Sequence, residues 1–363
     1  MQAIAAAIQQ IQVGWQSQKI RLEQAILTEP ECTLLKNALK EHSSVKSLEI
    51  CVCDIPTAEL IAFANGMKDY SLVGLQLIHL QLNDDVASAL ATAVQECALK
   101  KLDLAVNKMT SKGAIALAGA LNDCGLESLL LSRNKIGSAG VTSIAQVLSK
   151  GQSNLQTLDV SRNQIGDKGF IALCDALPTS NLDTLMVDSN GITHVGIVAL
   201  CEALKKSPRL LNLSVGGNGL KDESIILLAN TLKFTNLERL SINGNDFGPE
   251  AMTALSAAVS ASMTLQLLDL KQNLTIRDED LRVLIESIRT HRTLSTVVVD
   301  DTGTTQPIRE RLQRQLGALQ NEHAKTMTVL CSVKNIPRVG THSTLWILPK
   351  ELIRRMSIML MKI

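Results

Sequence analysis

The chain repeats one arrangement of apolar and polar positions many times. In the segment "LQTLDVSRNQI" (155–165) apolar side chains alternate at Leu158 and Val160, and the polar Asn163 follows them. This alternation predicts a short β-strand with one buried face. In the next part of a unit, such as "GVTSIAQVLSK" (140–150), apolar residues recur at intervals of three and four, which predicts an amphipathic helix. Each unit therefore reads as strand, turn and helix.

The same pattern begins again at regular intervals along most of the chain. Clear and weaker copies together start at eleven places, the last copy being incomplete: Ser17, Val45, Leu72, Leu99, Leu126, Leu155, Leu182, Leu210, Leu237, Leu265 and Leu294. Successive starts differ by 27 to 29 residues. So regular a period indicates an array of structural repeats. Small residues stand at one phase, near the start of several helices, and are expected to let each helix lie close to the strand layer: Gly113, Gly140, Gly169, Gly196 and Ala251.

These units resemble the leucine-rich repeat family, of the ribonuclease-inhibitor-like type, over about residues 17–320. The resemblance implies an α/β solenoid, a horseshoe with a concave parallel sheet and convex helices. It also implies that the ninth side chain of each unit bonds backbone groups where strand turns into loop, as a structural ladder and not as catalysis. Cys53 and Leu80 replace the ladder residue in two units, and the remaining members are Asn107, Asn134, Asn163, Asn190, Asn218, Asn245 and Asn273.

The pattern also predicts how the chain is divided. We expect an N-terminal capping helix and a degenerate first repeat in residues 1–44, and regular repeats in 45–293. A C-terminal cap is expected in 294–321, because "PIRERLQRQLGALQ" (307–320) places apolar residues on one helical face. Residues 322–363 lose the repeat period and are expected to form a helical tail.

Composition excludes several classes of partner. The net charge of +1 provides no overall field to attract nucleic acid, so no nucleic-acid partner is expected. No stretch reaches the roughly 18 apolar residues of a membrane span. The start of the chain, "MQAIAAAIQQIQVGW" (1–15), lacks the basic residues of a secretory signal and reads as a helix. We therefore expect a cytoplasmic protein.

The residues that suggest chemistry have structural explanations. Cys97 and Cys124 share one phase of the repeat and Cys174 and Cys201 share another, so they read as small core residues in a reducing compartment. The six histidines are scattered, and none lies with cysteine, aspartate or glutamate at metal-ligand spacing, which disfavours a metal site. The sequence lacks a phosphate-binding loop, a dinucleotide fingerprint and a nucleophile elbow. We expect no catalytic residue, no cofactor and no metal, and hence no enzyme.

The expected function is therefore a non-enzymatic scaffold that binds a protein of unknown identity. Side chains at the third, fifth, seventh and eighth positions of each unit are expected on the concave face or its rim. The hypothetical partner site consists of the charged residues of four consecutive units: Asp103, Arg133, Asp159, Arg162 and Asp188. The alternative is that this face is merely solvated. Because aromatic residues make up only 2% of the chain, modest affinity is expected.

The C-terminal region leaves further alternatives. The string LP-x-x-L at 348–352, with "LCS" at 330–332, partly resembles the suppressor-of-cytokine-signalling box and the opening of an F-box, which implies a ubiquitin-ligase substrate receptor. Residues 322–363 are otherwise expected to serve as a cap or docking helix, or as a basic amphipathic helix at a membrane surface. The repeat array alone is also similar to Ran GTPase-activating protein, which implies a regulator of a small GTPase.

Overall fold

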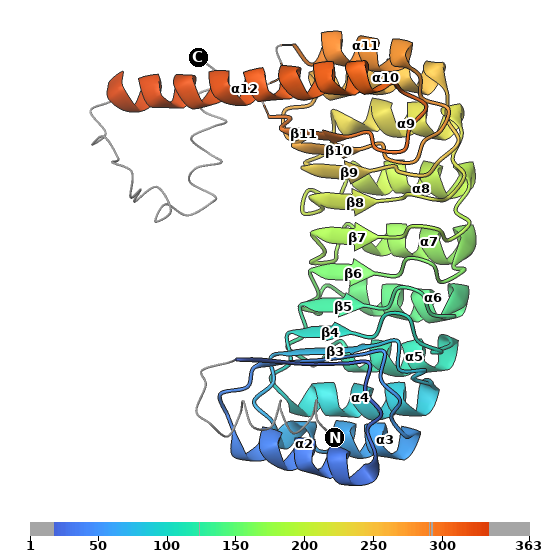
Figure 1. The fold of residues 1–363 in the computed structure, drawn as a ribbon. Helices are drawn as coiled ribbons and strands as arrows, with labels where there is room; N and C mark the ends of the chain where they lie inside the picture. The colour runs from blue at the N-terminus through green and yellow to red at the C-terminus, as the bar shows by residue number, and fades with distance from the viewer. Residues whose placement is uncertain (1–17, 123, 290, 292, 334–363) are drawn as a thin grey trace.

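The chain forms a stack of repeats in which one parallel sheet lies beside a row of helices (Figure 1). The computed structural model describes residues 18–122, 124–289, 291 and 293–333. Its eleven strands follow one another in sequence order across the sheet. They are β1 (Lys19–Glu23), β2 (Ser47–Cys51), β3 (Gly74–Ile78), β4 (Lys101–Asp103), β5 (Ser128–Leu130), β6 (Thr157–Asp159), β7 (Thr184–Met186), β8 (Asn212–Ser214), β9 (Arg239–Ser241), β10 (Leu267–Asp269) and β11 (Thr296–Val298). The predicted α/β repeat solenoid is confirmed.

A helix follows each strand and returns the chain to the start of the next one. A 3-10 turn, η1 (Met67–Asp69), follows the second of these helices. The helices are α2 (Glu29–Glu41), α3 (Thr57–Asn65), α4 (Asp84–Glu96), α5 (Ser111–Ala120), α6 (Gly137–Leu148), α7 (Gly166–Ala176), α8 (His194–Leu204), α9 (Asp222–Leu232), α10 (Pro249–Ala261), α11 (Asp278–Ser287) and α12 (Gln306–Val333).

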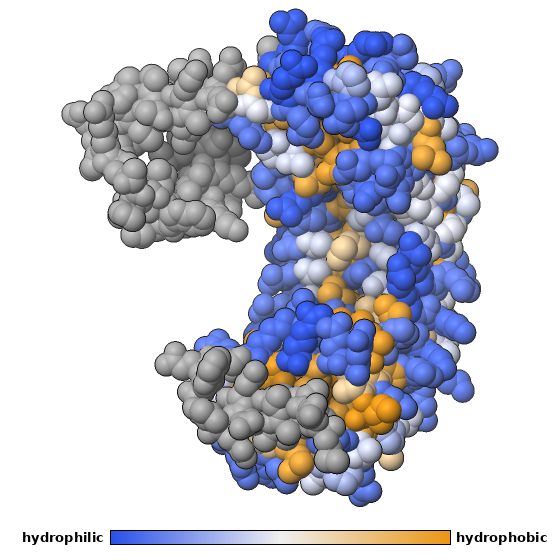
Figure 2. Space-filling model, in the orientation of Figure 1, coloured by the Kyte–Doolittle hydropathy of each residue, from blue (hydrophilic) through white to orange (hydrophobic). Residues whose placement is uncertain are grey.

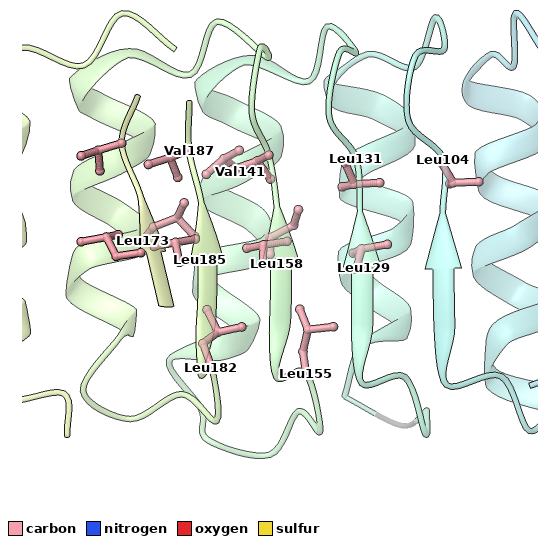
Figure 3. Packing of buried hydrophobic residues seen from close by; sticks show 14 of the residues in the cluster. Leu104, Leu129, Leu131, Val141, Leu155, Leu158, Leu173, Leu182, Leu185 and Val187 are labelled. Atoms are coloured by element: carbon pink, nitrogen blue, oxygen red, sulfur yellow. The ribbon is translucent and has the colours of Figure 1, made fainter. Parts of the chain in front are cut away.

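The core lies between the sheet and the helices and runs through the whole stack. Leu129, Leu158 and Leu185 sit directly beside one another on β5, β6 and β7, and all three are fully buried (Figure 3). Burying one such leucine contributes about 1.5–3 kcal/mol. Because the flanking strand residues point to the opposite side, the sheet has one face in the core and one face turned away from the helices. We call the second the open sheet face.

The small residues near the helix starts act between helices. A Cβ atom on Gly140 would lie 2.8 Å from Cβ of Ala114 on α5, and one on Gly169 would lie 3.0 Å from Cα of Ser138 on α6. The expectation that these glycines bring helices close to the strand layer is therefore wrong. They let consecutive helices approach one another, which sets the spacing of the repeats.

The two ends of the stack differ from the regular units. The first repeat has a strand, β1, and a helix, α2, whereas the helix expected in 1–15 lies outside the described residues. At the other end, Leu312, Leu316 and Leu319 of α12 are buried against the last layer. This helix continues to Val333, so the predicted boundary at residue 321 falls inside a helix. In the described part of the chain, no helix combines the length and apolar character needed to cross a membrane.

Candidate partner-binding face

The open sheet face carries a row of side chains at equal height on neighbouring strands. The register of the sheet places the fifth residues of the units side by side: Glu49, Gln76, Asp103, Leu130, Asp159, Met186, Ser214, Ser241, Asp269 and Val298. Carboxylates occupy this row on β2, β4, β6 and β10. Strands lie about 4.8 Å apart, so carboxylates two strands apart are separated by roughly 10 Å. The row is therefore an acidic stripe broken by polar and apolar residues.

Asp103 and Asp159 make the same local hydrogen bond at the end of their strands. The carboxylate of Asp103 accepts the backbone N–H of Ala105 at 3.0 Å, and that of Asp159 accepts the N–H of Ser161 at 2.9 Å. Asp103 is only 7% exposed, and this burial raises its pKa above the ordinary value, with smaller contributions from Asp159 and Glu49. Asp103 is therefore buried at the end of β4, whereas Asp159 is partly exposed.

Asp188 follows β7 and forms hydrogen bonds with both neighbouring repeats. Its Oδ1 accepts the hydroxyl of Ser214 at 2.5 Å and the backbone N–H of Gly216 at 2.6 Å, and its own N–H donates to Oγ of Ser161 at 3.1 Å. Burial raises the pKa of this carboxyl, although the two hydrogen bonds that it accepts oppose the shift. Asp188 is consequently held in one position relative to the neighbouring strands.

Arg133 and Arg162 occupy the same place in adjacent repeats and are both exposed. Their backbone N–H groups donate to the carbonyls of Ser161 and Asp188, at 2.9 and 2.7 Å. Within the described residues, neither guanidinium forms an ion pair. Two positive groups about one strand spacing apart therefore border the acidic stripe, free to meet a partner.

The backbone at this eighth position is left-handed in every repeat, which the sequence pattern did not reveal. Two of the units have glycine there, which adopts this conformation without strain, and nine have side chains that rarely do. The positive φ angles lie between 52° and 63° at Gln24, Val52, His79, Val106, Arg133, Arg162, Ser189, Gly217, Gly244, Gln272 and Asp301. The turn geometry, not the residue type, aims the two arginines.

The ladder residues bond backbone groups of their own repeat and of the preceding one. In Asn163, which is fully buried, Nδ2 donates to the carbonyls of Leu131 at 2.9 Å and Val160 at 3.0 Å, while Oδ1 accepts the N–H of Ile136 at 3.4 Å. Equivalent side-chain bonds to backbone groups are made by Asn107, Asn134, Asn190, Asn218, Asn245 and Asn273. These amides satisfy buried backbone groups.

The units that carry Cys53 and Leu80 in place of the ladder asparagine differ from the others. The thiol of Cys53 accepts the N–H of Ala25 at 3.5 Å and donates to the carbonyl of Cys51 at 3.4 Å, so a cysteine takes the ladder position. Leu80 offers no polar group, but its own N–H is accepted by Asn107 of the next repeat at 2.9 Å. The interruption therefore affects one rung and leaves the rest of the ladder joined.

A second ladder, on the helix side of the loops, was missed in the sequence. The carboxylate of Asp84, in the first turn of α4, accepts the N–H and hydroxyl of Thr110 at 2.7 and 2.6 Å and the N–H of Gly113 at 3.0 Å. Asp167 does the same for Thr193 at the start of α8. The sequence signal for this second ladder is an aspartate that recurs at one phase of the repeat, followed by an N-cap threonine one unit later. Each carboxylate fixes the start of the next helix.

The cysteines of the described residues are free thiols placed mostly in the core. Burial raises the pKa of Cys51 to about 11, with a further rise from the neighbouring Glu49 carboxylate. Burial also raises the pKa of the Cys174 thiol. In the same residues, no group of three or more histidine, cysteine, aspartate or glutamate side chains is arranged to hold a metal ion.

Comparisons with known proteins identify the repeat. The family described as "Leucine Rich repeat" matches residues 97–118, 124–145, 151–174 and 235–256. The human protein "NACHT, LRR and PYD domains-containing protein 13" is 31% identical over 90 residues, which are 24% of this chain and 8% of that protein. The match therefore spans less than a tenth of the length of that relative.

Two solved structures share a similar arrangement. The yeast Rad7 and Elc1 complex contains a chain with a TM-score of 0.48 and 16% identity, over 84% of this chain and 83% of that one. The C-terminal domain of tropomodulin from Caenorhabditis elegans has a TM-score of 0.37 and 13% identity, over 52% of this chain and 98% of that one.

Proposed function

This chain is a leucine-rich repeat protein, and we propose that it is a non-enzymatic scaffold that binds a protein partner on its open sheet face. Arrays of this kind generally serve protein–protein interaction, because stacked repeats offer one long continuous surface. The proposed site is centred on β4 to β8 and comprises Asp103, Arg133, Asp159, Arg162 and Asp188. Its chemistry is electrostatic, with two free guanidinium groups beside a row of carboxylates.

One observation carries this proposal: Arg133 and Arg162 are exposed, adjacent and without an ion-pair partner among the described residues, although carboxylates lie nearby. Such groups contribute little to folding but steer a charged partner and fix its register. Asp159 and Asp188, held by bonds to Ser161 and Ser214, supply the opposite charge. The proposed partner therefore presents both acidic and basic side chains.

Charge reversal tests this site directly. The double variant Arg133→Glu/Arg162→Glu is expected to keep the melting temperature and to lose its main cellular partner, more strongly at low than at high salt, because screening weakens exposed charges. The matched control is Lys112→Glu/Lys168→Glu, which makes the same change of charge on the exposed side of α5 and α7. Quantitative affinity purification at 50 and 500 mM salt measures the difference. Equal capture by both variants would move the site away from the open sheet face.

Two other functions stay predictions from the sequence. A regulator of a small GTPase is expected to accelerate GTP hydrolysis by a Ran-like GTPase. A ubiquitin-ligase substrate receptor, or any docking through 322–363, is expected to co-purify elongin-type or Skp-type subunits. The LP-x-x-L string at 348–352 and the basic helix considered for this region lie outside the described residues.

We also propose a cytoplasmic location. Cys174 and Cys201 support it, because they are free thiols buried on consecutive helices, as expected for a chain that folds under reducing conditions. Localisation of a tagged full-length chain by fluorescence microscopy tests this proposal.

A further inference from the structure

The residues at the eighth position of the units form one row along the rim of the sheet, because the backbone N–H of each donates to the seventh carbonyl of the next unit. Beside the first units the row carries Val52, His79 and Val106, and it then continues into Arg133 and Arg162. Val52 is 46% exposed, His79 is exposed as well, and Val106 is partly exposed. We call this stretch, which is largely apolar at one end and basic at the other, the rim row.

Val52 and Val106 occupy a backbone conformation that does not suit valine. Their φ angles are 54° and 59°, in the left-handed region, where a β-branched side chain is a steric outlier. The other nine residues at this position are glycine or have an unbranched Cβ. Neither valine is buried, so core packing does not explain its presence. Residues held in such conformations cluster at functional sites, which points to a binding role for the two valines.

A hollow beside Val52 enlarges the apolar end of the rim row. Its volume is about 630 Å³, and Val52, Pro56 and His79 are among the residues that line it. Ile26, which is 71% exposed, pairs with Asp54 at the edge of the same hollow. Figure 2 shows apolar surface among the N-terminal repeats, in the lower part of the view. A hollow of this size accepts an apolar side chain of a partner.

The spacing of the strands sets the length of segment that the rim row accommodates. Neighbouring strands lie about 4.8 Å apart, so Val52 and Arg133, three units apart, are separated by roughly 14 Å. An extended chain advances about 3.3 Å per residue, so about four or five residues cover this distance. A short extended segment therefore reaches both the valines and the arginines.

We propose that the rim row binds one extended segment of a partner protein that is apolar at one end and acidic at the other. Apolar side chains of the segment cover Val52 and Val106 and enter the hollow beside Val52. Its carboxylates meet Arg133 and Arg162, whose guanidinium groups form no ion pair with any described residue. This inference rests on the proposed binding at the two arginines and adds the chemistry of the segment that contacts the units before them.

The test uses the full-length chain and two fluorescein-labelled peptides, Ile-Leu-Ser-Thr-Ser-Glu-Glu and its reverse, so that both directions of the segment are covered. Control peptides of each direction carry Ser-Ser in place of Ile-Leu, or Gln-Gln in place of Glu-Glu. Fluorescence anisotropy is expected to show that one direction binds about tenfold more tightly than either of its controls. This preference is measured on the wild-type chain and does not depend on the folding of a variant.

Variants of the valines separate binding from backbone strain. Val52→Asn/Val106→Asn is expected to remove the preference for Ile-Leu and to keep the preference for Glu-Glu. Its melting temperature is expected to equal or exceed that of the wild type, because asparagine tolerates the left-handed backbone better than valine does. The matched control is Gln272→Asn, at the same position near the far end of the array, which is expected to bind every peptide as the wild type does.

The outcomes distinguish this inference from the proposed function. If the valine variant keeps the preference for Ile-Leu while Glu-Glu is still preferred, the apolar part of the site is wrong and the proposed function stands. If Arg133→Gln/Arg162→Gln keeps the preference for Glu-Glu, the proposed function fails and the inference fails with it. Absence of binding in both directions up to 2 mM contradicts the inference. Self-association of the wild type that the valine variant abolishes, measured by sedimentation velocity, would assign the valines to a second copy of the chain and contradict it as well.

Discussion

Oδ1 of Asn190 accepts the backbone N–H of Asn163, one repeat earlier, in a hydrogen bond of 2.8 Å. Asn163 in turn donates from its side chain to the carbonyl of Leu131, in the repeat before its own. One ladder residue therefore takes part in bonds that reach both neighbouring repeats. This connection couples the stability of each unit to that of the next, as in other repeat proteins.

Replacing one rung of this ladder is expected to destabilise the array. Asn163→Ala removes one of two side-chain donors from each of the buried carbonyls of Leu131 and Val160, and it removes the acceptor of the Ile136 N–H, so the free energy of unfolding is expected to fall by roughly 1–3 kcal/mol. Urea denaturation followed by circular dichroism measures the change. The control Asn154→Ala removes an exposed asparagine that donates to Cys124 at 3.2 Å, and is expected to cost less than about 0.5 kcal/mol. Equal losses of unfolding free energy in the two variants would show that the ladder bonds of Asn163 do not stabilise the array.

The left-handed backbone at the eighth position predicts opposite effects for the same substitution at two glycines. Gly244 has a φ of +58°, and a Cβ atom there would have ordinary contacts, so Gly244→Ala is expected to cost about 1–2 kcal/mol through backbone strain alone. Gly119 lies in α5 with open space around it, so Gly119→Ala is expected to stabilise by about 0.5–1 kcal/mol. Thermal unfolding of both variants tests the difference in sign. If Gly244→Ala stabilised the chain, the expected backbone strain at the eighth position would be contradicted.

The raised pKa of Asp188 predicts that the folded chain loses stability as pH rises. Burial raises its folded-state pKa above the ordinary 3.8, so the folded chain holds this proton when the unfolded chain has released it. The free energy of unfolding of the wild type should therefore fall, relative to Asp188→Asn, as pH rises from 3.8 through the raised pKa. Denaturation in urea between pH 3 and 7 measures this difference. Above the raised pKa, the difference should no longer change with pH.

Asp84 serves as the control with the opposite sign. Burial raises the pKa of Asp84, but hydrogen bonds from Thr110 and Gly113 outweigh that effect and leave the pKa below 3.8. Its stabilising contribution is therefore present above pH 3.8 and lost as pH falls through the lowered value. Asp84→Asn should consequently be most destabilising at neutral pH. If both variants follow the same trend with pH, the assignment for Asp188 is wrong.

Removing residues 334–363 is expected to leave the repeat array folded. The described part of α12 already closes the last layer with Leu312, Leu316 and Leu319. A chain ending at Val333 should therefore unfold at the same temperature in one transition. A shorter chain ending at Thr305 exposes the buried Val297 and is expected to aggregate or to melt in two steps. Aggregation of the longer of these two chains would show that 334–363 belongs to the cap.

The sequence by itself determined the repeat and its two layers. The period of apolar residues such as Leu129, Leu158 and Leu185 is local and recurs in every unit, so it fixes strand, helix and buried face without knowledge of distant contacts. Asn163 was identified as a ladder residue because the same residue type returns at the same phase.

The tertiary structure decided what depends on contacts between repeats or on exposure. The bond from Thr110 to Asp84 crosses 26 residues, so no pattern within a single unit identifies it. Asp103, expected at a binding surface, is buried, because its exposure depends on neighbours from other units. The left-handed turn at Val106 opposes the preference of valine, since the bonds between repeats outweigh local conformational energy there. Sequence periodicity thus sets each unit, whereas packing of units against one another sets the surface available to a partner.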